Sequence, residues 1–570
     1  MTDHTPSRAT LGDVIEAVRR ANLKPRKRQD IVSAILTIAK AVGREPPAIP
    51  ADLRTLNVKL RNLSGASIGI SPARLSNAKS LLRAGFALCA PIMPGRSNEA
   101  ISPDWLPLYQ RLRTRSDRIK LSRMVRWLSG RGICPKTVTV KDLEIFRVAL
   151  TDLSLTNDPE GNWVDTMRVW TRCVSEIEGW PDVVARPRQK DPHTYTLPWS
   201  AFPASLKQEA DAWLRRLAGE DILDDDGPLQ PLAKVTLKYQ EHYLRAFVSA
   251  LVLRGRKPET LTSIATCLTI DNYGEGVRFF HERFGKKPNA TAHRIATTMK
   301  GLARHWLKAD QATLQRMAKI TQKVAVKQNG MTQKNRDRLL QFEDPVVKDR
   351  LLNLPQELRR LAQNNRTSSH RRRTLAQVAV AIELLIVTLL RIKNLAALEL
   401  GHHLVRSGDR LFLTIPAEEL KTKMNALDFE LPMQTTELID WSVEGRNRRP
   451  TECRYLFPGE GGGHKSISTL RRQIEETVWK HVGAKVNPHL FRHLGGELYL
   501  ERNPGGYEVL RRVLGHARME TTTKYYAGRE TRGAAKHFAA EIRKLRERGL
   551  PPPPKCPTKP RSRRKVGANP

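Results

Sequence analysis

The chain has 570 residues, of which 40% are hydrophobic, and a formal net charge of +40. This length predicts about three or four domains with buried cores. A charge this positive predicts a polyanionic partner, with nucleic acid the first candidate and an anionic membrane surface the second, and it disfavours a basic surface that binds nothing. Basic residues follow the whole chain without forming an amphipathic basic helix, so we expect double-stranded DNA as the partner and no membrane.

Cysteine usage and hydropathy predict a cytoplasmic protein. The cysteines lie more than thirty residues apart, a spacing that excludes a zinc site and a disulfide framework and fits a reducing compartment. They are Cys89, Cys134, Cys173, Cys267, Cys453 and Cys556. The N-terminus lacks the apolar core of a signal peptide. The longest apolar run, 376–390, is interrupted by Gln377 and Glu383, and it predicts a buried helix rather than a membrane span.

The first 330 residues predict three helical modules with a loosely similar plan. Helical patterns recur within 1–95, 103–180 and 232–325. Within the first module, Ser71-Pro72 is a strong helix start. The stretch 185–231 between the second and third modules is rich in proline and charge, which is typical of a linker or extended arm.

The pattern changes after a polar, basic segment at 326–345, where we expect a hinge between domains. Beyond it, helices are predicted together with two alternating segments, 410–416 and 427–432, which are typical of a hairpin with a lysine-rich turn. The tail, 551–570, is basic and is expected to be disordered and to add phosphate contacts. The expected fold class is mainly α with a small β-sheet in the C-terminal domain (α+β).

The predicted domains follow from these changes of pattern. They are an N-terminal helical module at 1–95, a second helical module at 100–184, a linker at 185–231, a helical domain at 232–330, an α+β domain at 345–547 and a basic tail at 551–570.

The stretch 485–530 concentrates side chains that act on anions. Pro488 suits the first turn of a helix, on which His489 and Arg492, three residues apart, share a face. A second helical run ends at Gly515, a natural helix C-cap, so that His516 is held at a helix end.

Two adjacent tyrosines, Tyr525 and Tyr526, follow His516 after nine and ten residues. Two histidines, an arginine and a tyrosine at short spacing predict chemistry on an anion with tyrosine as the nucleophile. The residues themselves leave the choice between the two tyrosines open, with the other tyrosine packing on the domain.

Three motifs in this stretch resemble the C-terminal signature of the tyrosine recombinases, or phage-type integrases. They are H-L-F-R-H at 489–493, V-L-G-H at 513–516 and T-T-T-K-Y at 521–525. The resemblance covers residues 345–541 and extends more weakly over 232–330, which is similar to the family's helical core-binding domain. The first 230 residues have no clear counterpart in the family.

The resemblance implies a role for each residue of the site. Tyr525 would be the nucleophile, because the family places its tyrosine nine residues after the L-G-H histidine. Arg492 would clamp the phosphate, since arginine forms bidentate contacts with phosphate oxygens and stays charged. His489 would act as acid or base, and His516 would hydrogen-bond a nonbridging oxygen in a supporting role. His493 is expected to pack or bond within its own helix.

The first half of the site would come from about a hundred residues earlier. Arg391 matches the family's first arginine, which follows an apolar helix in a T-G-L-R-x-x-E-L context. Here Leu389 replaces the glycine, and Asn394 replaces the acidic residue. The family carries a lysine in its hairpin turn as general acid to the 5′ oxygen. Lys421 fills that role in our interpretation, and Lys423 is the alternative.

The family further implies a site-specific recombinase that needs neither metal, nor ATP, nor another cofactor. Tyrosine attack would leave a 3′-phosphotyrosyl link and a free 5′-hydroxyl. Four protomers, as a homotetramer or in a hetero-assembly with related recombinases, would exchange strands between paired DNA sites to integrate or excise a mobile element. We expect the protein in the cytoplasm, associated with the nucleoid. An amphipathic helix at 532–545 would dock on a neighbouring protomer or on its own domain.

Three alternative functions remain from the sequence. A type IB topoisomerase shares the chemistry and would work as a monomer. A DNA-binding accessory protein would have lost catalysis, although all six expected catalytic positions are filled. A nonenzymatic nucleic-acid packaging protein is suggested by charge alone.

Overall fold

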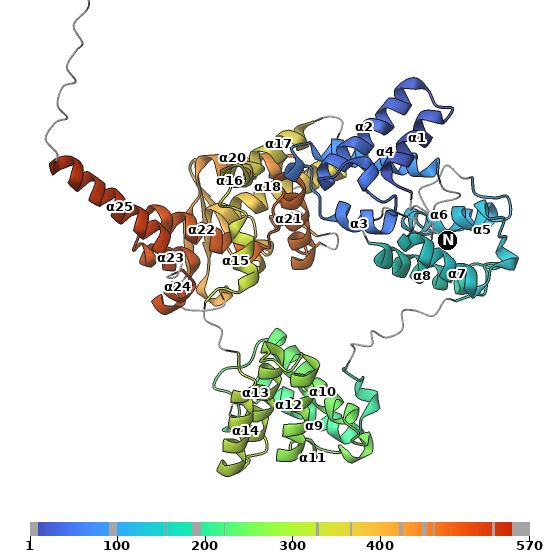
Figure 1. The fold of residues 1–570 in the computed structure, drawn as a ribbon. Coiled ribbons are helices and arrows are strands. Elements are labelled where there is room, and N and C mark those ends of the chain that lie inside the picture. Colours follow the sequence, from blue (N-terminus) through green and yellow to red (C-terminus); the bar gives the residue numbers. More distant parts are fainter. Residues whose placement is uncertain are drawn as a thin grey trace, which may run out of the picture. The chain divides into compact units, whose positions relative to one another are not determined.

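The computed structural model describes residues 9–89, 100–152, 154, 156, 158–184, 195–221, 223–326, 330–364, 367–420, 426–446, 453–459, 462–526 and 530–549 (Figure 1). Contacts within the chain divide it into two compact units. Unit 1 comprises Met1–Met93, Thr151–Asn157 and Asn329–Pro570, and unit 2 comprises Pro94–Leu150 and Asp158–Gln328.

Four helices at the start of unit 1 begin and end where local sequence dictates. Thr10 and Asp13 form a capping box at the first, and Pro25 opens the second. The helices bury their apolar faces in one core. The elements are α1 (Leu11–Arg20), α2 (Pro25–Val42), η1 (Pro46–Ala48), α3 (Leu53–Arg61), η2 (Ala66–Ile68) and α4 (Pro72–Ala87).

The C-terminal part of unit 1 is mainly helical. Its helices are α15 (Gln333–Leu340), α16 (Pro345–Leu352), α17 (Leu354–Gln363), α18 (Ser369–Val387), α19 (Ile392–Ala396), α20 (Met433–Glu444), α21 (Ile467–Val482), α22 (Pro488–Arg502), α23 (Tyr507–Leu514), α24 (Met519–Tyr526) and α25 (Glu530–Gly549). The apolar helix α18 lies in the core and contacts α17, α20, α21 and α22. This confirms the buried helix predicted from the longest apolar run.

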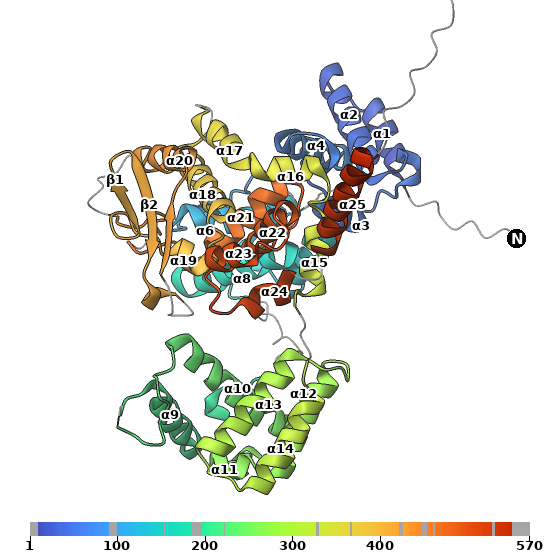
Figure 2. The same ribbon diagram turned by 90° about the vertical axis from the view of Figure 1, so that its left-hand side faces the viewer.

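A small antiparallel sheet lies beside α20 (Figure 2). Its strands are β1 (Leu404–Ser407), β2 (Arg410–Ile415) and β3 (Leu427–Glu430), in the order β1-β2-β3, and the 3-10 turn η6 (Ala417–Glu419) follows β2. Leu411, Leu413 and Ile415 are buried on one face of β2, as its alternation predicts. The two predicted strands are confirmed. The sequence does not predict β1, because only its first residue, Leu404, is buried and its pattern does not alternate. The fold class, mainly α with a small sheet, is confirmed.

The core of this region starts earlier than the sequence predicted. Met331, Leu339 and Phe342 are buried in the same core as α18. The predicted hinge at 326–345 is therefore wrong for residues 330–345. The segment has a polar composition because α15 buries little more than Leu339, and such a composition is typical of a hinge.

Unit 2 is helical throughout its described elements. They are α5 (Leu106–Gln110), α6 (Arg115–Gly130), η3 (Pro135–Thr137), α7 (Val140–Asp152, whose last two residues belong to unit 1), α8 (Pro159–Glu176), η4 (Trp199–Ala201), α9 (Ala204–Ala218), α10 (Lys234–Leu253), η5 (Pro258–Thr260), α11 (Ile264–Cys267), α12 (Ile270–Arg283), α13 (Ala290–His305) and α14 (Gln311–Lys323). Two separate apolar cores hold these helices, one within residues 101–183 and one within residues 195–324.

One prediction for unit 2 is wrong. The stretch 185–231 is predicted to be a linker or extended arm, yet α9 lies within it and buries Leu206, Ala210 and Trp213 in the core of α10–α14. The flanking prolines and the acidic run are typical of a linker, and the helix between them has only a narrow apolar face, so the sequence does not predict it.

Among the described residues, every helix is too short or too polar to span a bilayer.

Candidate active site

Arg391 is placed by a sharp turn at the end of α18. The helix stops at Val387, and Arg391 is the N-cap residue of α19 three residues after Thr388. Between them, Leu389 has a φ of 51°, in the left-handed region that glycine adopts without steric cost and leucine does not. The turn is therefore the one in which the family carries glycine. Burial lowers the pKa of Arg391, whose side chain is half-buried.

Packing compensates for the strained leucine. Leu389 is buried in a small cluster with Leu500, Leu510, Leu514 and Tyr526. A glycine would fit the turn but would leave this cluster without its central apolar side chain. Asn394, the other departure from the family pattern, lies within α19.

Helix α22 positions the predicted H-x-x-R pair. Asn487 caps it by accepting a hydrogen bond from the Leu490 N–H at 3.0 Å, and Pro488 occupies the first turn. His489 is exposed at this end, whereas Arg492, one turn later, is 3% exposed. Crowding by protein atoms around the ring lowers the pKa of His489, and the charges of Arg492 and Arg391 add to the effect.

Arg492 ties together the two loops that carry the other site residues. Its Nη1 donates to the carbonyl oxygen of Leu389, beside Arg391, and its Nη2 donates to that of Leu514 at 2.6 Å, beside His516. Burial, followed by repulsion from Arg391, lowers the pKa of Arg492 to about 9. A guanidinium has five N–H groups, so three remain for an anion after these two bonds.

His516 sits at a helix end, as predicted. Helix α23 ends at Leu514, and Gly515 adopts the left-handed C-cap conformation with a φ of 58°. The ring Nδ1 lies 3.0 Å from the Thr522 hydroxyl of α24. Burial and the charges of Arg492 and Arg391 lower the pKa of His516 to about 4, so the ring is neutral near neutral pH.

The two adjacent tyrosines lie in opposite environments at the end of α24. Tyr525 is 37% exposed, whereas Tyr526 is 3% exposed. The Tyr526 hydroxyl donates to the Arg492 carbonyl oxygen at 2.9 Å. Burial raises the pKa of Tyr526 well above its ordinary value. Tyr526 is thus a packing residue whose phenolate is disfavoured, and Tyr525 is the tyrosine open to a substrate.

His493 is a residue whose surroundings the sequence did not reveal. It is 4% exposed, and its ring centroid lies 4.7 Å from that of His489, 5.7 Å from that of Tyr525 and 6.1 Å from that of Tyr526. It packs within its own helix as expected, but it also contacts both tyrosines of α24. The only signal was its position four residues after His489, which predicts a shared helix face and says nothing about α24.

The predicted general acid cannot be placed. Lys421 and its alternative Lys423 lie outside the described residues, which end at buried Leu420 on one side and resume shortly before β3 on the other. Their assignment therefore stays a prediction. The structure brings together four of the predicted residues: Arg391, His489, Arg492 and His516. The two arginines lie close enough to the two histidines for their charges to lower the pKa of both rings.

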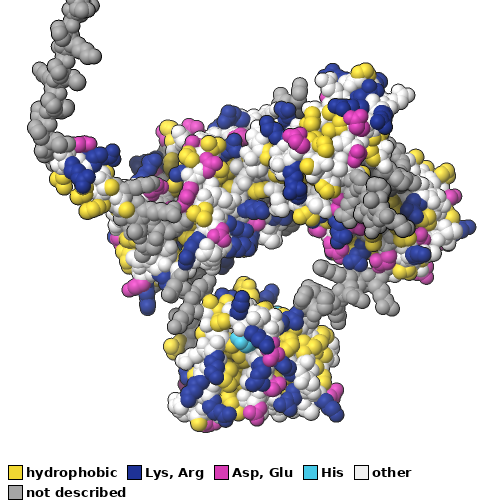
Figure 3. Space-filling model, in the orientation of Figure 1, with side chains coloured by type: hydrophobic (Ala, Val, Ile, Leu, Met, Phe, Trp, Pro, Cys, Tyr) yellow, Lys and Arg dark blue, Asp and Glu magenta, His cyan; other side chains and the backbone are white. Residues whose placement is uncertain are grey.

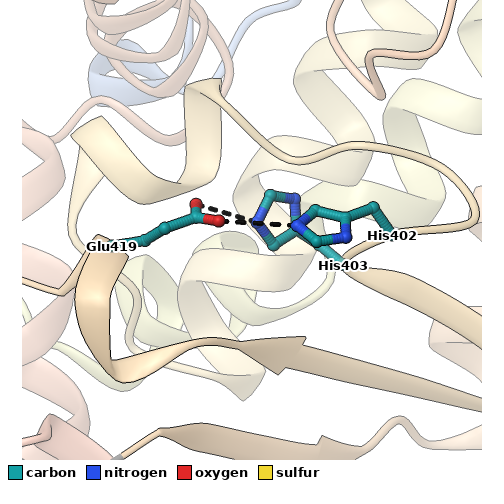
Figure 4. Close-up of side chains that lie close together, drawn as sticks. All are labelled: His402, His403 and Glu419. Carbon is teal, nitrogen blue, oxygen red and sulfur yellow. Dashed lines mark hydrogen bonds and ion pairs between the residues drawn. The ribbon is translucent and has the colours of Figure 1, made fainter.

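A histidine–carboxylate cluster includes Glu419, two residues before Lys421 (Figure 4). His402 and His403 place their Nε2 atoms 3.5 and 3.0 Å from the carboxylate oxygens of Glu419, at the end of η6. The three could face a metal ion. However, the Glu399 N–H donates to Nδ1 of His403 at 3.1 Å, so in a neutral ring Nε2 carries the proton. That nitrogen then donates to Glu419 and has no lone pair for a metal, so the cluster fits a hydrogen-bonded anchor for η6.

A comparison with protein families matches the part of the chain that holds this site. The sequence model of the phage integrase family matches residues 354–532, which include every predicted site residue. The chain therefore carries a domain of the phage integrase family, the tyrosine recombinases. No protein with a curated description matches the chain.

Solved structures of recombinases also align with this chain. XerH site-specific recombinase bound to palindromic difH substrate in a post-cleavage complex is 14% identical with a TM-score of 0.32, covering 60% of this chain and 99% of its own. XerA recombinase is 13% identical with a TM-score of 0.24 and the same coverage. The integrase from mycobacterium phage Brujita is 16% identical with a TM-score of 0.21, covering 57% of this chain and 90% of its own. Identities and TM-scores this low support no inference about the function of this chain.

Proposed function

We propose that this protein is a site-specific DNA recombinase that cleaves and rejoins strands through a 3′-phosphotyrosyl intermediate. The observation that carries the proposal is a cluster of two arginines and two histidines, with the exposed Tyr525 next in sequence to Tyr526, whose hydroxyl donates to the Arg492 carbonyl oxygen. The phage integrase match over the same residues supports it. Integration or excision of a mobile element is the role we infer from the family.

The arginines would bind the scissile phosphate before reaction. In the transition state, negative charge builds up on the nonbridging oxygens, and cations fixed in place beforehand stabilise it without reorganisation. Arg391 supplies a half-buried guanidinium, and Arg492 supplies one held rigidly by two carbonyl oxygens. Because Arg492 is fixed from both sides, it also sets the distance between the loops of Arg391 and His516.

The histidines would then act as neutral groups. His489 is exposed and its pKa is lowered, so it can accept the proton that Tyr525 loses on attack. The Thr522 hydroxyl donating to Nδ1 of His516 would leave the Nε2–H to donate to a nonbridging oxygen. In the same step the 5′ oxygen leaves and takes a proton from Lys421, our candidate general acid.

The charge of the chain would hold the duplex. Lys and Arg side chains are spread over the visible surfaces of both units in Figure 3, as expected for a protein that contacts many phosphates. We further propose that the 232–330 domain and the catalytic domain bind double-stranded DNA and that four protomers act on paired sites. Helix α25 contacts α22 of its own chain and leaves Phe538 and Leu545 exposed, at 69% and 60%, for contact with a neighbour.

The test is covalent trapping on nicked duplexes that tile both ends of the DNA element carrying the gene. A nick shortly 3′ of the cleavage site lets the short fragment that bears the new 5′-hydroxyl diffuse away, so the phosphotyrosyl adduct accumulates. We expect an adduct from the native protein and from Tyr526→Phe, and none from Tyr525→Phe. Tyr525→Phe should keep the native stability, because Tyr525 is partly exposed. Tyr526→Phe should lower the free energy of unfolding by about 1 kcal/mol through loss of its hydrogen bond.

Three outcomes would contradict the proposal. An adduct from Tyr525→Phe would exclude Tyr525 as the nucleophile. DNA binding with no adduct on any nicked duplex would identify an accessory or packaging protein. Relaxation of supercoiled plasmid by the monomer, without a preferred sequence, would identify a type IB topoisomerase.

A further inference from the structure

The segment that leads into the catalytic core is firmly attached where it enters unit 1. Met331 is 5% exposed within the core, and its carbonyl oxygen accepts a hydrogen bond from Nε of Arg336 at 3.1 Å. Thr332 is the N-cap residue of α15. The residue before this anchor, Gly330, has a φ of 71°, so its backbone already adopts a conformation that favours glycine.

Gly330 lies directly against the end of the helix that carries the proposed nucleophile. A Cβ added to Gly330 would stand 2.6 Å from the carbonyl oxygen of Lys524, well inside van der Waals contact. Lys524 is the residue before Tyr525 in the last turn of α24. The contacted atom belongs to the backbone, so it cannot rotate away as a side chain would. A side chain at position 330 would therefore force either the Gly330 segment or the end of α24 to move.

The opposite side of this helix end is also fixed. Tyr526 donates its hydroxyl to the Arg492 carbonyl oxygen, and its ring lies so close to Gly496 of α22 that a Cβ there would stand 2.6 Å from Cε1. The last turn of α24 is therefore held between the Gly330 segment and α22. Tyr525 lies in sequence between the two held residues, Lys524 and Tyr526.

We propose that Gly330 is a positioning residue for Tyr525. Its missing side chain lets the segment that leads into α15 close against the Lys524 carbonyl, and this contact sets the end of α24 relative to Arg492 and the two histidines. The inference rests on the proposed function, because it assumes that the place of Tyr525 matters for cleavage. A misplacement of about 1 Å can lower a rate by about a hundredfold.

The test compares Gly330→Ala with Gly408→Ala. Gly408 lies between β1 and β2 with a φ of 59°, and a Cβ there would meet nothing within 4 Å. Both variants carry the same kind of backbone strain, but only Gly330→Ala presses on α24. We expect Gly330→Ala to lower the single-turnover cleavage rate at saturating DNA by at least about tenfold relative to Gly408→Ala, with DNA affinity unchanged. Equal cleavage rates in the two variants would overturn the proposal.

Two further measurements keep the test decisive. Asparagine tolerates positive φ better than alanine, so Gly330→Asn and Gly408→Asn repeat the comparison if the alanine variant does not fold. A 3-fluorotyrosine at position 525 reports its surroundings by ¹⁹F NMR without any reaction. Its resonance should shift in the Gly330 variants and not in the Gly408 variants. If the native protein forms no adduct, the proposed function fails, while an unshifted resonance in the Gly330 variants overturns this inference by itself.

Discussion

At the scale of single residues, burial assigns different roles to side chains of equal chemistry. Tyr525 and Tyr526 are adjacent, yet one is open to solvent and the other donates its hydroxyl to the Arg492 carbonyl oxygen. Leu389 occupies a left-handed turn that a glycine would adopt more easily. In both places a packed neighbour from another segment decides what the residue does.

The pH dependence of stability should report on His516. Its pKa is lowered in the folded protein to about 4, from an ordinary value of 6.5, so the unfolded chain binds the proton first as the pH falls. We expect the free energy of unfolding to decrease from about pH 6.5 down to about pH 4 and to lose this contribution fully below pH 4. Urea unfolding at a series of pH values should show a flatter decrease for His516→Gln. Identical profiles for the two proteins would contradict the lowered pKa.

Restoring the family glycine at position 389 should destabilise this protein. Glycine relieves the left-handed strain, worth about 1–2 kcal/mol, but a buried leucine contributes about 2–5 kcal/mol to a core. We expect the free energy of unfolding to decrease in the order native, Leu389→Gly, Leu389→Ala, because alanine loses the packing and keeps the strain. Chemical unfolding of the three proteins gives the order. A Leu389→Gly protein more stable than the native one would show that the cluster around Leu389 contributes little.

At the scale of elements, helix ends place the site. Arg391 opens α19, His489 lies in the first turn of α22, and His516 follows the C-cap of α23. Local signals fix the ends of α22 and α23, namely the Asn487 cap and the Gly515 C-cap, so a site residue at these ends depends on the cap beside it. Of these signals, the Asn487 cap is the one that can be removed with least disturbance.

Removing the cap of α22 should affect cleavage more than its cost in stability suggests. Asn487→Ala should lower the free energy of unfolding by about 1 kcal/mol, because the Leu490 N–H loses its acceptor. Ser466→Ala is the matched control, since Ser466 caps α21 through the Thr469 N–H at 3.1 Å and α21 carries no proposed site residue. With stability losses alike, only Asn487→Ala should slow adduct formation. Equal rates of adduct formation in the two variants would show that the Asn487 cap does not set the position of His489 and Arg492.

At the scale of the whole molecule, the main feature is the formal net charge of +40. Residues 9–89 alone contain 14 Lys and Arg against 5 Asp and Glu, so the region without a family counterpart shares the basic character of the rest. Charge of this kind supplies affinity for DNA without supplying sequence specificity.

DNA binding should accordingly be steeply salt-dependent. Contacts to about six to ten phosphates would lower the affinity by about 10³–10⁵-fold between about 50 and about 200 mM salt, because bound counterions are released on association. Fluorescence anisotropy with a labelled duplex and Tyr525→Phe, which cannot react, measures this slope without cleavage. An affinity that hardly changes with salt would argue against a wrapped duplex.

The sequence by itself determined the fold class, and it predicted the family resemblance of the C-terminal region and the candidate site residues. These depend on local signals: the apolar run of α18, the alternation along β2, and the spacing of the H-x-x-R, L-G-H and K-Y motifs. Helix ends such as Gly515 were equally readable, because a cap is decided by a few neighbouring residues.

Only the tertiary structure decided which tyrosine is buried, that His493 contacts both of them, that α9 joins a core and that the core around α18 includes Met331. Each of these depends on a surface supplied from far away in the sequence. Tyr526 is buried because Gly496, thirty residues earlier, leaves room for its ring, and Gly330 lies against Lys524 across nearly two hundred residues. Burial is a property of the packed chain, and two adjacent tyrosines with the same chemistry differ in nothing else.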